Sequence, residues 1–93
     1  MNINVQQTPN PDTLKFVLDL ELVKNGTIEF KTIEDAKDYP FVQKIFQLGA
    51  ELVFFGSNFI SVKKTNLSKW EDILGKVSDV IKVDFPQGFK TIV

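Results

Sequence analysis

A chain of 93 residues suits one domain, because a single hydrophobic core usually organises about 50–200 residues. Its composition is 43% hydrophobic and 25% charged with a formal net charge of −1, which is ordinary for a globular protein and gives no basic face for nucleic acid. Cysteine, histidine and arginine do not occur. These counts exclude disulfides, thiolate nucleophiles, zinc or iron–sulfur ligation by Cys or His, and Ser-His or Cys-His catalysis.

The N-terminal third predicts three strands. Polar and apolar residues alternate over residues 2–6, as in a half-buried strand, and Pro9 and Pro11 then end the pattern in a turn. Alternation resumes at Leu14, and Asn25-Gly26 predicts a type I′ hairpin that returns through a strand containing Ile28 and Phe30. The expected apolar face of the second strand contains Leu14, Phe16, Leu18, Leu20 and Leu22.

The next segment predicts a helix. Residues 32–38 are polar and acidic, which favours a connection or a short helical lead-in. Pro40 suits the first turn of a helix and Gly49 suits the position after its end. Apolar residues recur between them at helical spacing: Phe41, Val42, Ile45, Phe46 and Leu48.

A second hairpin follows the helix, with strands at 51–55 and 59–64. A three-residue loop at 56–58 would pair Phe55 with Phe59, and we expect this register because it separates the two faces. One face would then contain Leu52, Phe54, Ile60 and Val62. Phe55 and Phe59, with Val53, would lie on the face that the helices do not cover.

The last element is an amphipathic helix that Pro86 stops. Its apolar stripe is Leu67, Trp70, Ile73, Leu74, Val77, Val80 and Ile81. We therefore expect an α+β fold: a two-layer sandwich with a mostly antiparallel sheet, in the order β-β-β-α-β-β-α, and two helices packed on one face. Residues 1–86 would form the domain, and 87–93 a C-terminal tail or the start of a linker.

The titratable residues predict no enzyme. The adjacent carboxylates Glu34-Asp35 and Glu71-Asp72 point in different directions and make no acid–base pair, so both are interpreted as surface charge. No calcium loop or phosphate loop is present, and Lys63-Lys64 is interpreted as a solvated strand end. No catalytic, metal-binding or cofactor-binding residue is predicted.

The N-terminus and the apolar runs predict a compartment. No apolar run approaches the ~18–20 residues that span a bilayer. The first seven residues lack a cationic start and an apolar stretch, and no Arg-rich presequence is present. We expect a cytoplasmic protein without membrane or nucleic-acid partners, although a chain already trimmed of its presequence would look the same.

Two ordered blocks resemble the N-terminal domain of Nfu/NifU-type iron–sulfur cluster scaffold proteins. The first block is Thr8-Pro9-Asn10-Pro11 followed by Leu14-Lys15-Phe16, and the second runs from Leu52 to Lys64. The helix that contains Trp70-Glu71-Asp72 follows them in the same order as in that family. The chain departs from the family at Tyr39-Pro40, where Ser-Pro is usual, and at Ala50-Glu51, where Gly-Val is usual.

The resemblance implies an accessory domain in iron–sulfur cluster assembly or transfer. In that family a Cys-x-x-Cys motif in a separate C-terminal domain holds the cluster, so no cofactor is expected in this chain. The implied partners are proteins: the cluster-binding scaffold domain, iron–sulfur carriers or apoproteins. The candidate contact residues are Thr8, Pro9, Asn10, Pro11, Lys15, Phe55, Gly56 and Phe59.

Each group of candidate residues also has a purely structural explanation, and other functions stay open. Proline rigidity and an Asn side chain bonded to its own backbone would explain residues 8–11 as turn chemistry. A cross-strand clamp worth ~0.2–1 kcal/mol would explain Phe55 and Phe59. A stand-alone small-ligand-binding or regulatory domain, or an adapter unrelated to iron–sulfur chemistry, stays open as another function.

Overall fold

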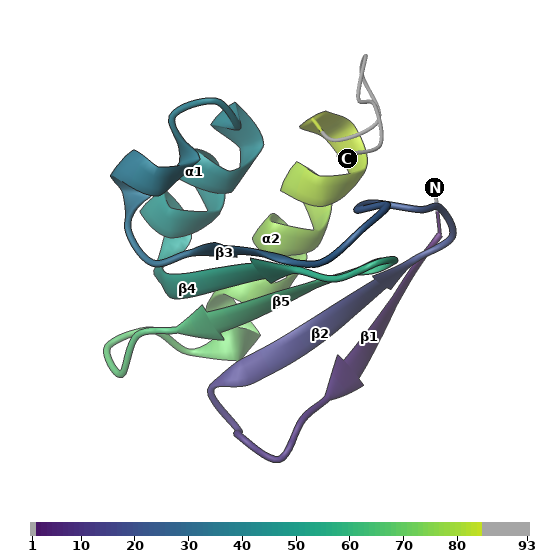
Figure 1. Ribbon diagram of the computed structural model, residues 1–93. Helices are drawn as coiled ribbons and strands as arrows, with labels where there is room; N and C mark the ends of the chain where they lie inside the picture. Colours follow the sequence, from purple (N-terminus) through teal and green to yellow (C-terminus); the bar gives the residue numbers. More distant parts are fainter. Residues whose placement is uncertain (1, 85–93) are drawn as a thin grey trace.

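The computed structural model describes residues 2–84 as one antiparallel sheet with two helices on one face (Figure 1). The elements are β1 (Ile3–Gln7), β2 (Thr13–Leu18), β3 (Ile28–Phe30), the 3₁₀ turn η1 (Ile33–Ala36), α1 (Pro40–Leu48), β4 (Ala50–Phe55), β5 (Phe59–Lys64) and α2 (Trp70–Asp84). The sheet order is β1-β2-β5-β4-β3. The predicted two-layer α+β fold is therefore confirmed, whereas the expected boundary at residue 86 and the 87–93 tail lie outside the described residues.

The first predicted hairpin is wrong in both its turn and its partner strand. Gly26 has a φ of 79°, but no described residue other than glycine has a positive φ, so Asn25-Gly26 does not form the expected type I′ turn. β3 pairs with β4 at the far edge of the sheet and not with β2. The reason is that β1 and β5 already occupy the two edges of β2. The chain after β2 crosses the end of the sheet instead, where the backbone N–H groups of Leu22 and Val23 donate to the Ser57 carbonyl oxygen at 2.6 and 3.3 Å.

The first long helix is the one that the sequence predicts. α1 begins with Pro40 in its first turn and ends at Leu48, and the cap residue Gly49 follows with a φ of 127°, which favours glycine. A Cβ atom at Gly49 would also collide with the Ser68 Oγ. Ser68 belongs to the segment that leads into α2, so this glycine lets the two helices approach each other.

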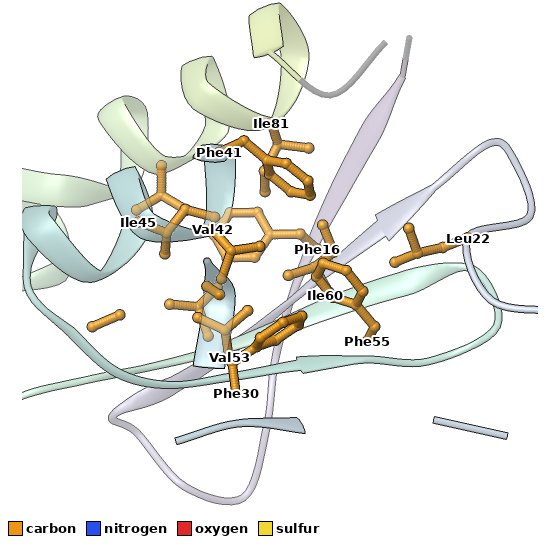
Figure 2. Close-up of a cluster of buried hydrophobic side chains, with 14 of the residues drawn as sticks. Phe16, Leu22, Phe30, Phe41, Val42, Ile45, Val53, Phe55, Ile60 and Ile81 are labelled. Carbon is orange, nitrogen blue, oxygen red and sulfur yellow. The ribbon is translucent and has the colours of Figure 1, made fainter. Parts of the chain in front are cut away.

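One hydrophobic core lies between the helices and the covered face of the sheet (Figure 2). Its largest fully buried side chains are Phe16, Phe30, Phe55, Leu22, Ile45, Ile60, Ile81, Val23, Val42, Val53 and Val62. Leu67 is an exception to the predicted stripe, because it is 96% exposed in the turn before α2 begins at Trp70. No helix within residues 2–84 is both long and apolar enough to cross a membrane.

Candidate functional site

The register of the β4–β5 hairpin decides which aromatic residues reach the surface. The Gly56 N–H donates to the Phe59 carbonyl oxygen at 2.9 Å, so the loop is the two residues Ser57 and Asn58. Phe55 pairs with Ile60, one position away from the expected three-residue register. Because side chains alternate along a strand, this shift turns β4 over and exchanges the faces of Phe54 and Phe55.

Phe55 is consequently a core residue, and its expected exposure is wrong. Its side chain is fully buried. Its ring lies 4.9 Å from Phe30 in an edge-to-face arrangement and 5.9 Å from Phe41 in a stacked one, measured between ring centroids (Figure 2). These contacts with β3 and α1 remove Phe55 from the candidate contact surface.

Phe54 and Phe59 occupy the uncovered face of the sheet instead. Their rings stack with centroids 6.1 Å apart and planes 26° apart, and both side chains are half-buried. The pairings Val17↔Phe59 and Leu52↔Lys63 place two further half-buried apolar residues on the same face. We call these four residues the sheet-face patch: Val17, Leu52, Phe54 and Phe59.

Gly56 and Lys15 complete the surroundings of Phe59. A Cβ atom at Gly56 would overlap the Phe59 ring, so the absence of a side chain there lets the ring lie against the backbone. The Lys15 Nζ lies 4.2 Å from the centroid of the same ring, a cation–π contact. Two predicted candidates, Lys15 and Gly56, therefore gather around Phe59.

Charged residues surround the sheet-face patch. The Lys63 Nζ lies 3.3 Å from the Glu51 carboxylate, and the Lys31 Nζ lies 3.6 Å from the Glu29 carboxylate. Glu29 is the cross-strand partner of Phe54. An apolar centre with a charged rim is the usual anatomy of a protein-binding surface.

The Thr8–Pro11 turn makes its own hydrogen bonds. The Thr8 hydroxyl lies 2.9 Å from both the Asn10 and the Thr13 carbonyl oxygens, and the Asn10 side-chain oxygen accepts from the Asp12 N–H at 2.9 Å. These bonds account for the polar side chains as turn chemistry. The side chains of Pro9 and Pro11, by contrast, are exposed.

Trp70 at the start of α2 ties this turn to the helix layer. Its indole N–H donates to the Asp12 carbonyl oxygen at 3.2 Å, and its ring centroid lies 6.2 Å from that of Phe16. Asp12 also pairs with Lys64, with 3.0 Å between the carboxylate and Nζ. The turn is thus held by both β5 and α2.

A cleft of about 400 Å³ lies between this turn and α2. We call it the turn cleft, and its lining residues are Gln7, Thr8, Pro9, Asn10, Pro11, Thr13, Leu14, Trp70 and Leu74. None of these side chains is charged. The predicted candidates Thr8–Pro11 therefore line a neutral, mostly apolar depression on the helix side of the sheet.

The predicted contact residues form two groups that do not meet. Lys15, Gly56 and Phe59 lie at the sheet-face patch, whereas the Thr8–Pro11 turn contributes to the cleft on the helix side. The sequence reasoning missed Phe54 because it placed β4 in the wrong register. It missed the lining role of Trp70 and Leu74 because the helical stripe alone assigned both residues to the core.

The carboxylates of the described residues do not form a metal-binding cluster. Within residues 2–84, no three Asp, Glu, His or Cys side chains are close enough together to hold a metal ion. The chemistry that the two surfaces offer is apolar and aromatic contact with charged residues at the rim, which is the chemistry of binding.

Comparisons with known proteins identify the family. The sequence pattern of the family described as "Scaffold protein Nfu/NifU N terminal" matches residues 3–88. Among curated proteins, the relative named "NFU1 iron-sulfur cluster scaffold homolog, mitochondrial" from Drosophila willistoni is 37% identical over 90 residues, which cover 95% of this chain and 31% of that protein. The protein of the same name from Drosophila persimilis is 38% identical, with 95% and 32% covered. The chain thus spans about a third of the length of these relatives.

Solved structures agree with this fold. A Staphylococcus aureus protein solved by X-ray crystallography has a TM-score of 0.75 and 30% identity, and the match covers 87% of this chain and 99% of that one. A NifU-like protein from Saccharomyces cerevisiae solved by NMR has a TM-score of 0.84 at 23% identity, with 98% and 83% covered, and it shows the fold alone.

These comparisons also correct one expectation. The curated relatives are named as mitochondrial proteins, which contradicts the cytoplasmic compartment expected from the sequence. The sequence of a folded domain is weak evidence for its compartment, because targeting segments are separate from the folded domain and are removed from it. The family model and the curated relatives together establish that the chain belongs to the Nfu/NifU N-terminal scaffold family.

Proposed function

We propose that this chain is a non-catalytic accessory domain in iron–sulfur cluster assembly or transfer, which binds proteins and does not itself hold the cluster. The role in iron–sulfur cluster assembly is supported by the family of the chain and by its relatives, which are named as cluster scaffolds. The composition supports the proposal that another domain holds the cluster, because a chain without cysteine or histidine lacks the usual protein ligands of a cluster. The cluster would belong to a separate cysteine-bearing domain.

The sheet-face patch is the observation that carries the protein-binding part of the proposal. Phe54 and Phe59 stack on the side of the sheet opposite the helices, and both remain partly exposed to solvent. Aromatic residues at the centre of a binding surface commonly contribute most of its affinity, because their large surfaces lose water on contact. Lys15, held above the Phe59 ring, adds a cation for an acidic group of the partner.

A titration tests this function directly. The probe is the isolated Cys-x-x-Cys domain of an Nfu-type scaffold, loaded with its cluster, and isothermal titration calorimetry measures its affinity for the full chain. The double variant Phe54→Ser with Phe59→Ser should weaken binding at least tenfold. A loss of ~1.4 kcal/mol produces that factor, and aromatic anchors often contribute more.

Two controls make the result decisive. Leu67→Ser alters a side chain that is 96% exposed in the turn before α2 and does not belong to the patch, so its affinity should equal that of the unmodified chain. Circular dichroism must show that the double variant is folded. Equal affinities for the double variant and the unmodified chain would exclude the patch, and no binding by either would reject the proposed role with this partner.

A further inference from the structure

Within residues 2–84, β1 is an edge strand that pairs with β2 alone (Figure 1). Four of its five residues are exposed. Its sequence, Ile-Asn-Val-Gln-Gln, contains no charged residue, proline or glycine. Natural proteins usually shield such edges with charges, prolines, bulges or very short strands. The opposite edge strand, β3, is only three residues long and contains Glu29.

The register shows which backbone groups of β1 face outward. The Leu18 N–H donates to the Asn58 carbonyl oxygen, so the backbone of Leu18 faces the β5 side. Backbone direction alternates along a strand, so Val17 faces β1 and bonds with its partner Asn4. The intervening residues Ile3, Val5 and Gln7 therefore direct their N–H and C=O groups away from the sheet. Within residues 2–84, no backbone hydrogen bond outside the regular strands uses these groups.

Side chains along this edge add an apolar feature on the helix side. Val5 pairs with Phe16, which is buried in the core, so Val5 also points to the helix side, yet it remains 38% exposed. Gln7 pairs with Leu14, and both line the turn cleft. The free backbone edge and the cleft thus adjoin at Gln7.

We propose that the β1 edge and the turn cleft together bind an extended, uncharged segment of another protein. The segment adds as a sixth strand by bonding to Ile3, Val5 and Gln7. Cross-strand neighbours point to the same face, so a residue opposite Gln7 directs its side chain toward the cleft. Backbone bonds would supply affinity, and an apolar side chain in the cleft would supply selectivity.

The chemistry of the site selects this occupant. Unpaired N–H and C=O groups at alternate residues match a partner strand, which carries the same groups at the same spacing. The five β1 residues and the nine lining residues carry no charge, so a charged side chain would lose water without gaining an opposite charge. The inference depends on the proposed function in one respect: it takes the other protein to be a component of iron–sulfur cluster assembly.

A peptide selection tests the site without any iron–sulfur protein. A phage-displayed library of random 12-residue peptides is panned against the full chain, and recovered peptides are synthesised with a fluorescent label for anisotropy titrations. Trp70 is the only tryptophan of the chain and lines the cleft, so its fluorescence reports occupation of the cleft. We expect uncharged peptides rich in β-branched residues with one large apolar residue, and a shift of the Trp70 emission on binding.

Three variants locate the binding. Val5→Pro removes one outward N–H without touching the bonds to β2, so the chain should fold and lose at least tenfold in peptide affinity. Its matched control, Val5→Ala, keeps that N–H and should stay within threefold of the unmodified chain. Leu74→Gln keeps a good helix-forming residue while making the cleft wall polar, and should also weaken binding several-fold.

Other outcomes overturn the proposal. Recovery of no peptide, or affinities that Val5→Pro and Leu74→Gln leave unchanged, would reject it. A concentration-dependent dimer in analytical ultracentrifugation that Val5→Pro abolishes would show that a second copy occupies the edge. The Phe54→Ser, Phe59→Ser double variant should bind peptides normally, so failure of the sheet-face patch and failure of this site are separable.

Discussion

The two faces of the β4–β5 hairpin differ although their residues are adjacent in sequence. Phe55 is fully buried and surrounded by other rings on the helix side, whereas Phe54 and Phe59 stack half-exposed on the open side. The same residue type therefore stabilises the core on one face and is available for binding on the other. The difference arises from a single position of strand register.

The largest expected effect concerns the covered face. Phe55→Ala removes a ring enclosed by Phe30 and Phe41, and should lower the free energy of unfolding by about 3–5 kcal/mol. Phe54→Ala, its matched neighbour, should cost about 1 kcal/mol because its ring is half-exposed. Urea unfolding measures both values. Equal losses would mean that the two faces do not differ as the register indicates.

A smaller effect is expected at the contact between Gly56 and Phe59. Gly56→Ala places a methyl group against the Phe59 ring and should lower the free energy of unfolding by about 1–3 kcal/mol, because the ring must move. Gly75 lies in α2 with open space around it, so Gly75→Ala should instead raise the free energy of unfolding by up to about 1 kcal/mol.

A double-mutant cycle sharpens this prediction. In a Phe59→Ala background, Gly56→Ala should become nearly neutral, since the colliding ring is gone. Thermal unfolding of the four proteins gives the coupling. A Gly56→Ala cost that persists without the ring would place the strain in the turn backbone and not in the open-face contact.

The hydrogen bond from Trp70 to the Thr8–Pro11 turn region should contribute about 1 kcal/mol to the free energy of unfolding. Trp70→Phe removes the N–H that donates to the Asp12 carbonyl oxygen, which still accepts from the Lys64 N–H at 2.9 Å. Denaturant unfolding and hydrogen exchange at the turn amides measure the change. A loss as large as that of Phe55→Ala would show that Trp70 acts as a core residue and not as a surface anchor.

The smallest effect is expected on the open face. Lys15→Met keeps the length of the side chain while removing the cation above Phe59, and should cost about 0.5 kcal/mol. The cost should vanish in a Phe59→Leu background, which lacks the aromatic ring. An undiminished cost in that background would assign the effect of Lys15 to another contact.

Local features of the sequence determined several elements directly. Pro40 and Gly49 bracket α1 because proline suits a first helical turn and the end of α1 requires a positive φ. The two prolines of the Thr8–Pro11 turn end β1, and the alternation of Leu14 and Phe16 identifies the core face of β2. These features depend on neighbouring residues alone, so the sequence was sufficient to predict them.

Tertiary structure decided what local patterns left ambiguous. Val53-Phe54-Phe55 is apolar at every position, so alternation could not select a face, and only the two-residue turn and the packing of Phe55 against Phe30 did. Asn25-Gly26 indicated a turn but not its partner strand, because pairing depends on which sheet edge is unoccupied. The turn cleft likewise forms only when α2 brings Trp70 to the Thr8–Pro11 turn. Trp70 and Asp12, which share a hydrogen bond there, are 58 positions apart in the sequence.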